Sequence, residues 1–385
     1  MHWGATAMKI LITDIHHGNG GGHVTYISSL VRGLSRDHDV TVASPPTGRL
    51  FKRLSEMPGV RAVPGLYTSR PLEMWREVRA LRRFLEAERF DVIHVNGGAD
   101  HRHVMLATLG MRDRPGIVWT KHNTNPVSSL GHALRARFGT HTSIAVCDYV
   151  ARILESSAYR QRPIQVVRNG IDTALLTPAS ADEKSEFRTR LFGQLPADVI
   201  VLGSLGGTDH NKGWHLLVQA ASRLPDSMRA RLRIVVAGDP PADDLRSQVE
   251  ASGMTPYVLF PGLVADVRSV LGACDVGFVL SFREAASYAS CETMAMSLPA
   301  LVSNAGGLPE NVRHGVDGWV VPTGNVDALE GVLREILHGP ERLPVMGASA
   351  RERVESVFCP HKFIQDTRAV YSGALSLARG AAGAL

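Results

Sequence analysis

The stretch KILITDIHHGNGGGHVTYISSL, residues 9–30, joins an apolar run to a helical pattern through a glycine-rich turn. The run at 9–15 has the continuous apolar character of a strand that is buried on both faces. Beyond the glycines, Val24, Ile27, Leu30 and Val31 recur at the spacing of one helix face. The stretch therefore predicts a strand, a tight turn and a helix, the repeating unit of a parallel α/β sheet.

This glycine turn does not match the two common phosphate-binding signatures. A dinucleotide fingerprint needs G-x-G-x-x-G, but counting from Gly18 places His23 at the third glycine, and counting from Gly20 places Thr25 there. The G-K-[ST] of a P-loop is also missing. Two interpretations stay open: the glycines at 20–22 let a ligand approach the backbone, or they only form a tight turn.

Short apolar runs alternate with helical patterns along the whole chain. The runs expected to be strands are, in order, KILITDI, DVTVAS, DVIHVNG, GIVWTKH, TSIAVCD, PIQVVRNG, VIVLGSL, LRIVVAGD, VLFPGL, VGFVLSF, PALVSNAG and GWVVPTG. Apolar strands separated by helices predict parallel sheets with both faces covered, so the fold class is α/β. The polar stretch 172–198 has no strand pattern and divides the runs into two series, which predicts two doubly wound domains.

The expected boundaries follow from that division. We expect an N-terminal domain over 1–172, a linker over 173–198, a C-terminal domain over 199–360 and a last helix over 361–385. Ligands of doubly wound sheets bind beyond the carboxyl ends of the strands. Two such domains that face each other would leave a central cleft for a ligand.

Length and composition agree with an ordinary globular protein of two domains. The chain has 385 residues, of which 44% are hydrophobic and 21% charged. No apolar run approaches the roughly 20 residues of a membrane span, and the start lacks the features of a signal peptide, so we expect a cytoplasmic protein. Residues 1–7 precede Met8 and are interpreted as an earlier start or a vector remnant. The four cysteines, which lack C-x-x-C spacing, indicate a reducing compartment and no zinc site: Cys147, Cys274, Cys291 and Cys359.

Two glutamates lie where a doubly wound domain binds its ligand. Glu284 follows the run VGFVLSF, and Glu292 comes eight residues later, in or at the start of a helix. A carboxylate at the carboxyl end of a parallel strand can accept two hydrogen bonds from a vicinal diol. Backbone amides at the intervening helix start suit a phosphate. The alternative is that both glutamates are surface acids, one of them capping the helix.

Lys212 stands at an unusual place for a cation. It immediately precedes a helix whose apolar face is formed by Trp214, Leu217, Val218 and Ala221. A positive charge is unfavourable at a helix N-terminus, which favours a bound anion over a merely solvated lysine. Such a lysine can neutralise a diphosphate leaving group.

These pieces together resemble the retaining GT-B glycosyltransferases of family 4, also called group 1. The matching stretches run in family order over nearly the whole chain: GNGGGH, VVRNGID at 166–172, NKG at 211–213, the E-x7-E pair, ETMAMSLPALVSNAGGLPENV and GVDGWVVPTGNVDAL. The resemblance implies two Rossmann-like domains around a cleft. The C-terminal domain would hold a nucleotide-diphosphate sugar, the N-terminal domain would hold the acceptor, and the last helix would cross back onto the N-terminal domain.

The resemblance also implies roles for single residues of the C-terminal domain. Glu292 would bind the ribose hydroxyls, and Glu284 would either contact the donor sugar or lie at the reacting face. Lys212 would bind the diphosphate, and the amides around Ala286 and Ser287 would meet the sugar or the phosphate. No metal and no cofactor are expected, because the lysine and the helix N-terminus take the place of a metal ion.

Further donor contacts are implied by the turns that follow the first strands of the two domains. Gly21 and Gly22 would allow the donor phosphates to approach the first domain, and Gly203 would open the corresponding turn of the second. His122 ends the run GIVWTKH and would lie near the reacting sugar. The alternative for His122 is an ordinary loop histidine.

Three departures from the family pattern concern details of the donor site. Ser204 and Asn211 stand where the family often has arginine, so either the phosphate affinity is lower or another base such as His210 substitutes. Ala285 to Ser287 replace a frequent G-F-G and give a stiffer loop, which can change the preferred sugar. Both glutamates and Lys212 remain.

Other functions stay as alternatives. A sugar-nucleotide 2-epimerase also places a nucleotide between two Rossmann-like domains, and a catalytically degenerate subunit would bind the nucleotide sugar without turnover. A dehydrogenase is disfavoured by the failed fingerprint. His101 and His103, two residues apart, are a poor ligand set for a metal, so we interpret them as loop residues at the rim of the first domain.

The charge of the chain indicates where its acceptor resides. The net charge is +5, and a basic stretch over 75–90 has apolar residues at helical spacing. This stretch is either a solvated helix or a helix that meets an anionic membrane. With the family resemblance, it favours a lipid-linked or glycan acceptor in lipopolysaccharide or other surface-glycan assembly, at the inner face of the membrane.

No pattern indicates nucleic-acid binding. Uridine diphosphate is the family's commonest donor base, but no residue names the base, sugar or acceptor.

Overall fold

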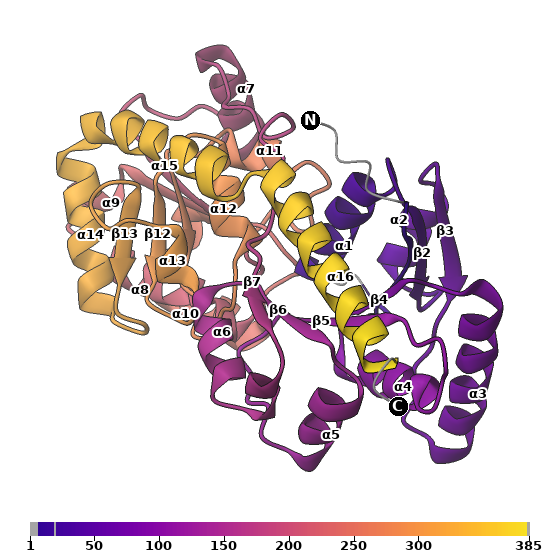
Figure 1. Ribbon diagram of the computed structural model, residues 1–385. Coiled ribbons are helices and arrows are strands. Elements are labelled where there is room, and N and C mark those ends of the chain that lie inside the picture. Colours follow the sequence, from indigo (N-terminus) through magenta and orange to yellow (C-terminus); the bar gives the residue numbers. More distant parts are fainter. Residues whose placement is uncertain (1–6, 19–20, 383–385) are drawn as a thin grey trace. The chain divides into compact units, whose positions relative to one another are not determined.

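The computed structural model describes residues 7–18 and 21–382, which form two compact units (Figure 1). The first unit comprises Met1–Gly170 and Pro360–Leu385, and the second comprises Ile171–Cys359. Residues 173–198, expected as a linker, therefore lie within the second unit. They contain the helix α7 (Ala181–Phe192), which ion pairs fasten to the rest of the unit: Lys184 and Arg188 both contact Asp275.

The first unit is built on a seven-stranded parallel sheet in the order β3-β2-β1-β4-β5-β6-β7. Its strands are β1 (Lys9–Thr13), β2 (Asp39–Ser44), β3 (Val60–Pro64), β4 (Val92–Val95), β5 (Gly116–Lys121), β6 (Thr142–Ala145) and β7 (Ile164–Val166). Its helices are α1 (Gly21–Leu34), α2 (Arg49–Ser55), α3 (Pro71–Glu88), α4 (Gly98–Thr108), α5 (Leu130–Phe138), α6 (Asp148–Glu155) and α16 (Pro360–Ala382), with a 3₁₀ turn at Ala158–Gln161.

The second unit has a six-stranded parallel sheet in the order β10-β9-β8-β11-β12-β13. Its strands are β8 (Ile200–Ser204), β9 (Leu232–Val236), β10 (Val258–Leu259), β11 (Val276–Val279), β12 (Ala300–Ser303) and β13 (Gly318–Val321). Besides α7, its helices are α8 (Trp214–Ser222), α9 (Asp226–Arg229), α10 (Asp243–Ala251), α11 (Val267–Leu271), α12 (Tyr288–Ala295), α13 (Leu308–Asn311), α14 (Val326–His338) and α15 (Leu343–Val357). Short 3₁₀ turns lie at His210–Lys212, Thr255–Tyr257 and Pro340–Arg342.

The two parallel sheets confirm the predicted pair of Rossmann-like units, and each of the twelve quoted runs contains a strand. The sequence analysis missed only β3. This edge strand is half exposed along its length and is not buried at any of its five positions, so it lacks the apolar run that marked the others.

Helix α16 belongs to the first unit although it ends the sequence. It packs on β5 so closely that a β-carbon at Gly116 would lie 2.8 Å from the backbone nitrogen of Leu375. Its Tyr371 hydroxyl lies 2.7 Å from Nδ1 of the buried His94, whose Nε2 lies 2.6 Å from Thr120 Oγ1. Burial lowers the pKa of His94 to about 3, so this imidazole is neutral and both its nitrogens need uncharged partners.

Candidate functional site

Lys212 and Glu284 meet in the second unit where the strand order reverses. From β8 the chain runs to β9 and β10 on one side, and later returns to β11 on the other side of β8. Lys212 lies in the 3₁₀ turn that follows β8, and Glu284 lies in the loop that follows β11. Lys212 Nζ is 3.3 Å from Glu284 Oε2. Doubly wound sheets bind their ligands in the crevice at this reversal, beyond the carboxyl ends of the strands.

Asn211 joins the two loops that carry these charges. Its carbonyl accepts a hydrogen bond from the Phe282 amide at 2.8 Å, and its side-chain amide donates to the Arg283 carbonyl at 3.1 Å. The Glu284 carbonyl accepts in turn from the Gly307 amide, at 3.2 Å. Asn211, a departure from the family pattern, thus has a positioning role in this chain.

Glycines let the loops of this unit approach one another. Gly213 has a φ of 64°, and a β-carbon there would lie 2.2 Å from the Leu280 carbonyl oxygen. Gly207 and Gly238 also have positive φ, and a β-carbon at Gly238 would lie 2.8 Å from the Gly207 α-carbon. The sequence analysis missed the Gly207–Gly238 contact.

Gly203 does not open the turn after β8, as the sequence analysis expected, and its role in donor binding stays a prediction. Gly203 lies inside β8 and is buried, and a β-carbon there would lie 2.3 Å from Cys274 Sγ. Packing against Cys274 accounts for this glycine, and the turn proper begins after Ser204.

Ser287 begins the helix that separates the two glutamates. It is the N-cap of α12, and its hydroxyl accepts a hydrogen bond from the Ser290 amide at 3.2 Å. The first turn of a helix leaves backbone N–H groups without intrahelical partners, and the helix dipole adds positive potential there. Ala286 and Ser287 therefore present an amide-rich turn on the same loop as Glu284.

Glu292 lies on the second turn of α12 and is half buried. Burial raises the pKa of its carboxyl from an ordinary 4.5 to about 7. In the part of the chain that the structure describes, no hydrogen bond or ion pair engages its carboxylate. A half-buried acid whose partners are not supplied by the protein is suited to receive hydroxyl groups from a ligand.

His122 directly follows β5 in the first unit and is held by its neighbours. Its Nε2 lies 2.9 Å from Asn96 Oδ1, which follows the adjacent strand β4. Its ring packs against the rings of His23 and Tyr26, with centroid distances of 4.4 and 4.6 Å. Burial holds the pKa of His122 well below its usual range, so the ring is neutral.

The glycine turn is described only in part, because Gly20 lies outside the described residues. Helix α1 begins at Gly21, which has a φ of 47°. Gly21 and Gly22 are exposed, and a β-carbon at Gly21 would meet no atom within 4 Å. Gly21 therefore leaves open space above the backbone, and its conformation rather than packing favours glycine.

His101 and His103 were wrongly placed in a loop. Both lie in α4 and are buried. His101 Nε2 lies 3.0 Å from the Gly139 carbonyl, and His103 bonds the Ala99 carbonyl and Glu77. They are internal polar links of the first unit, which sequence spacing alone did not reveal.

Comparison with known families follows the same division of the chain. The model of "Glycosyl transferases group 1" matches residues 188–353, and that of "Glycosyltransferase Family 4" matches residues 20–175. Together the two models cover most of the chain, one for each sheet. The chain belongs to the family 4, group 1 glycosyltransferases. It is similar to a mycobacterial enzyme, the GDP-mannose-dependent alpha-(1-6)-phosphatidylinositol monomannoside mannosyltransferase of Mycobacterium tuberculosis strain CDC 1551, at 26% identity over 90% of this chain and 93% of that protein.

Solved glycosyltransferase structures share the fold of this family 4 member. HepE from Anabaena, solved with UDP, aligns with a TM-score of 0.79 at 20% identity, over 95% of this chain and all of that one. WaaG, a glycosyltransferase involved in lipopolysaccharide biosynthesis, aligns with a TM-score of 0.69 at 16% identity, over 92% and 98% of the two chains. These likenesses confirm the GT-B fold class. Neither family model supports the epimerase alternative.

Proposed function

We propose that this glycosyltransferase moves a sugar from a uridine diphosphate sugar to a hydroxyl of a glycan or lipid-linked acceptor, with retention at the anomeric carbon. The observation that carries the proposal is the convergence of Lys212, Glu284 and the start of α12 at the strand-order reversal, beside the unpartnered Glu292. HepE, with the same fold, was solved with UDP. The mycobacterial relative is named as GDP-mannose-dependent, so the base is decided by experiment.

In this proposal each group of the second unit meets one part of the donor. Glu292 accepts hydrogen bonds from the ribose diol. The amides of Ala286 and Ser287 and the ammonium of Lys212 bind the diphosphate, and Glu284 contacts the donor sugar. When the donor arrives, Lys212 exchanges its 3.3 Å contact with Glu284 for the diphosphate, which frees the Glu284 carboxylate for sugar hydroxyls.

Catalysis then consists mainly of stabilising the leaving group. The anomeric carbon gains positive charge as the diphosphate departs, and Lys212 with the helix N-terminus offsets the negative charge that develops on the phosphate. We propose that no metal ion is needed for this step. On the first unit, we propose that the exposed Gly21 and Gly22 leave the backbone open to a ligand and that the neutral His122 offers a hydrogen bond to it.

A transfer assay tests the proposal. Purified chain is incubated with radiolabelled UDP-glucose, UDP-galactose, UDP-N-acetylglucosamine and GDP-mannose, without and with a lipid-linked glycan extract, and released nucleotide is measured. Release of one nucleotide, abolished by Glu292→Ala and Lys212→Ala but kept by Glu341→Ala at an exposed site, is the expected result. Tight nucleotide binding without release under any condition would instead favour a degenerate subunit.

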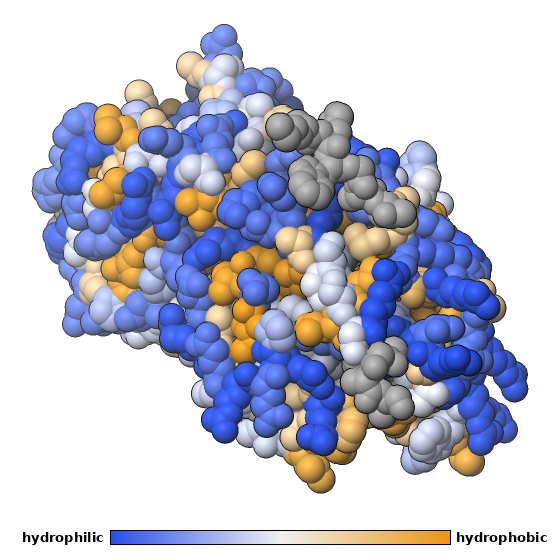
Figure 2. Space-filling model, in the orientation of Figure 1, coloured by the Kyte–Doolittle hydropathy of each residue, from blue (hydrophilic) through white to orange (hydrophobic). Residues whose placement is uncertain are grey.

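We also propose that the first unit contacts an anionic membrane from the cytoplasmic side. Helix α3 exposes Leu72 and Trp75, at 80% and 49%, beside the exposed Arg79 and Arg83. The edge of the molecule where α3 lies is otherwise largely hydrophilic in Figure 2. Exposed apolar side chains next to basic ones suit the headgroup region of a bilayer. Within the described residues, no helix is both long enough and apolar enough to span a membrane.

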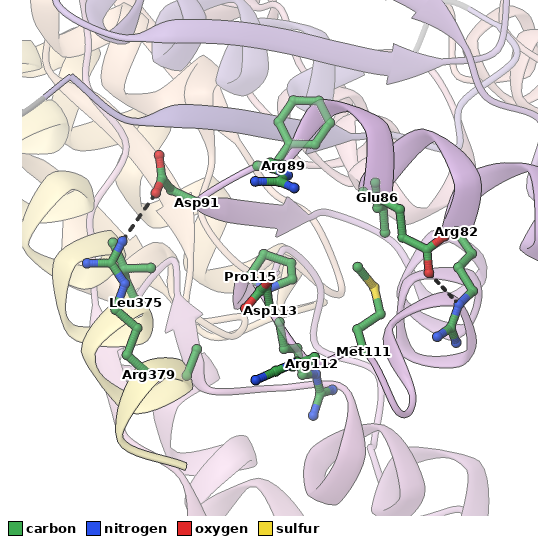
Figure 3. Close-up of a pocket in the computed structure, with 14 residues that line it drawn as sticks. Arg82, Glu86, Arg89, Asp91, Met111, Arg112, Asp113, Pro115, Leu375 and Arg379 are labelled. Carbon is green, nitrogen blue, oxygen red and sulfur yellow. Dashed lines mark hydrogen bonds and ion pairs between the residues drawn. The ribbon is translucent and has the colours of Figure 1, made fainter. Parts of the chain in front are cut away.

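An arginine-lined pocket adjoins the C-terminal end of α3. It has a volume of about 550 Å³ and lies at the amino-terminal ends of β4 and β5. Asn96 and His122 follow the carboxyl ends of the same two strands. Figure 3 shows arginines from α3, the loop before β5 and α16 around it, with ion pairs at Arg82–Glu86 and Arg379–Asp91. Its arginines outnumber its acids, which supports contact with anionic headgroups: Arg82, Arg89, Arg112, Arg114 and Arg379 against Glu86, Asp91 and Asp113.

Vesicle sedimentation tests this contact. The double variant Arg79→Glu, Arg83→Glu should bind phosphatidylglycerol vesicles at least tenfold more weakly, because each basic residue near a charged surface contributes about 1 kcal/mol. Arg82 is left intact because it also holds the Leu109 carbonyl. Arg246→Glu, exposed in the second unit, is the matched control. Unchanged binding of the double variant would exclude α3 as the membrane contact.

A further inference from the structure

Three potential metal-binding side chains converge at the end of β1 and the start of α1. Asp14 directly follows β1, His16 lies two residues later, and His23 lies in the first turn of α1. One ligand atom from each residue lies within 4.8 Å of the other two. Asp14 Oδ1 is 2.7 Å from His16 Nδ1 and 3.8 Å from His23 Nδ1. We propose that Asp14, His16 and His23 bind one divalent transition-metal ion of the zinc class.

The buried carboxylate of Asp14 is the central group of this cluster. Its side chain is fully buried, and in the described part of the chain its ion pairs are with these two imidazoles alone, without a lysine or arginine. A buried carboxylate is costly unless a positive charge and hydrogen bonds compensate it. Only the backbone amide of His16 adds a further donor, at 3.2 Å. A metal ion held by the imidazoles would place a full positive charge beside this carboxylate.

His23 provides a second, independent indication. Its Nδ1 is buried and has no hydrogen-bond partner among the residues that the structure describes. Leaving a buried ring nitrogen without a hydrogen-bond partner costs free energy. This nitrogen lies 3.8 Å from Asp14 Oδ1, and a metal ion bound by both atoms would give the nitrogen a partner.

The geometry suits a small ion with little rearrangement. Tetrahedral ligand atoms about 2 Å from zinc lie about 3.3 Å from one another, between the two measured separations from Asp14. Two imidazoles and one carboxylate favour zinc, cobalt or nickel over magnesium and calcium, which prefer oxygen ligands. His122 packs on His23, but its Nε2 is engaged by Asn96, so it is a neighbour rather than a ligand.

The ion would link β1 to α1 across the glycine turn, and it is distinct from the charges proposed to neutralise the donor diphosphate. Lys212, Glu284 and Glu292 belong to the second unit, whereas all three metal ligands belong to the first. The fourth coordination position would remain open to water or to an oxygen of a bound ligand.

Cobalt titration tests the site. Untagged full-length chain, stripped with chelator, is titrated with Co²⁺ while the visible absorption is followed, and Zn²⁺ is then added as a competitor. We expect one equivalent to bind, to be displaced by zinc and to raise the midpoint of thermal unfolding. His16→Ala and His23→Ala should each weaken binding at least tenfold, while His17→Ala, an exposed neighbour, should not.

Three results would overturn the proposal. The first is that wild type binds no stoichiometric cobalt, and the second is that His16→Ala and His23→Ala both bind cobalt as tightly as wild type. The third is a cobalt–thiolate absorption band, which would place the ion on a cysteine. Circular dichroism of His16→Ala, whose side chain is partly exposed, shows whether loss of metal reflects loss of fold. Titration of UDP into metal-free wild type reports on the donor site separately, so failure of either proposal is recognised on its own.

Discussion

Replacing Glu292 with glutamine should stabilise the protein at alkaline pH while harming its function. In the folded chain burial raises the pKa of Glu292 to about 7, against 4.5 as the ordinary value. Between these two pH values the unfolded chain releases the proton and the folded chain keeps it. The free energy of unfolding contributed by this group therefore falls as pH rises from about 4.5 to about 7, and the loss is complete above that.

The size of the effect follows from the difference between the two pKa values. At about 1.4 kcal/mol for each pH unit, the buried charge costs on the order of 3 kcal/mol above pH 7. Glutamine has nearly the same shape and no charge, so Glu292→Gln should be more stable than wild type by about 2–3 kcal/mol at pH 8 and nearly equal at pH 5.

Chemical denaturation at pH 5 and pH 8 measures this difference. Glu341→Gln, at an exposed position of the same unit, is the matched control and should change little at either pH. A stability difference that does not grow between pH 5 and pH 8, or a glutamine variant that is less stable at pH 8, would refute the reasoning. This cost of burying the charge is the expected consequence of keeping a carboxylate free for a ligand.

Two further predictions concern packing. Gly203→Ala should lower the free energy of unfolding by about 1–3 kcal/mol, because the added methyl group overpacks against Cys274. Denaturation should show a smaller loss when Cys274→Ala is also present. An equal loss with and without Cys274→Ala would show that Cys274 does not cause it. Tyr371→Phe should lower the free energy of unfolding by about 1–3 kcal/mol, because it leaves a buried nitrogen of His94 without its partner; an unchanged denaturation midpoint would show that this bond does not hold α16 in place.

The fold could be predicted from the sequence because parallel strands buried on both faces are continuous apolar runs. The stretches KILITDI and VGFVLSF became β1 and β11 for that reason, and the change in strand order places ligand-binding loops after them. The edge strand β3 was not predicted because it is partly exposed and therefore lacks a continuous apolar run. The helix α7 escaped because it buries no residue and is held by ion pairs instead.

The candidate site was predictable only where charge and position in the chain coincide. Lys212 and Glu284 each follow a strand, and their contact confirms that these loops meet. Gly203 was misplaced because the sequence does not distinguish a glycine at the end of a strand from one in the following turn. Its packing against Cys274, which explains the glycine, is visible only in the structure. The pairing of Asp14 with His16 and His23 spans the glycine turn, and spacing alone does not show that these side chains point together.

Calorimetric titration of UDP, GDP and ADP into wild type, Glu292→Ala, Lys212→Ala and Glu341→Ala tests the donor site most directly. The proposal predicts that one nucleoside diphosphate, UDP, binds to wild type and to Glu341→Ala. It also predicts binding about 10–100-fold weaker in the other two variants, since each loses a charge-assisted contact. Affinity that is unchanged in Glu292→Ala and Lys212→Ala, or no binding of any diphosphate to the folded wild type, would contradict it.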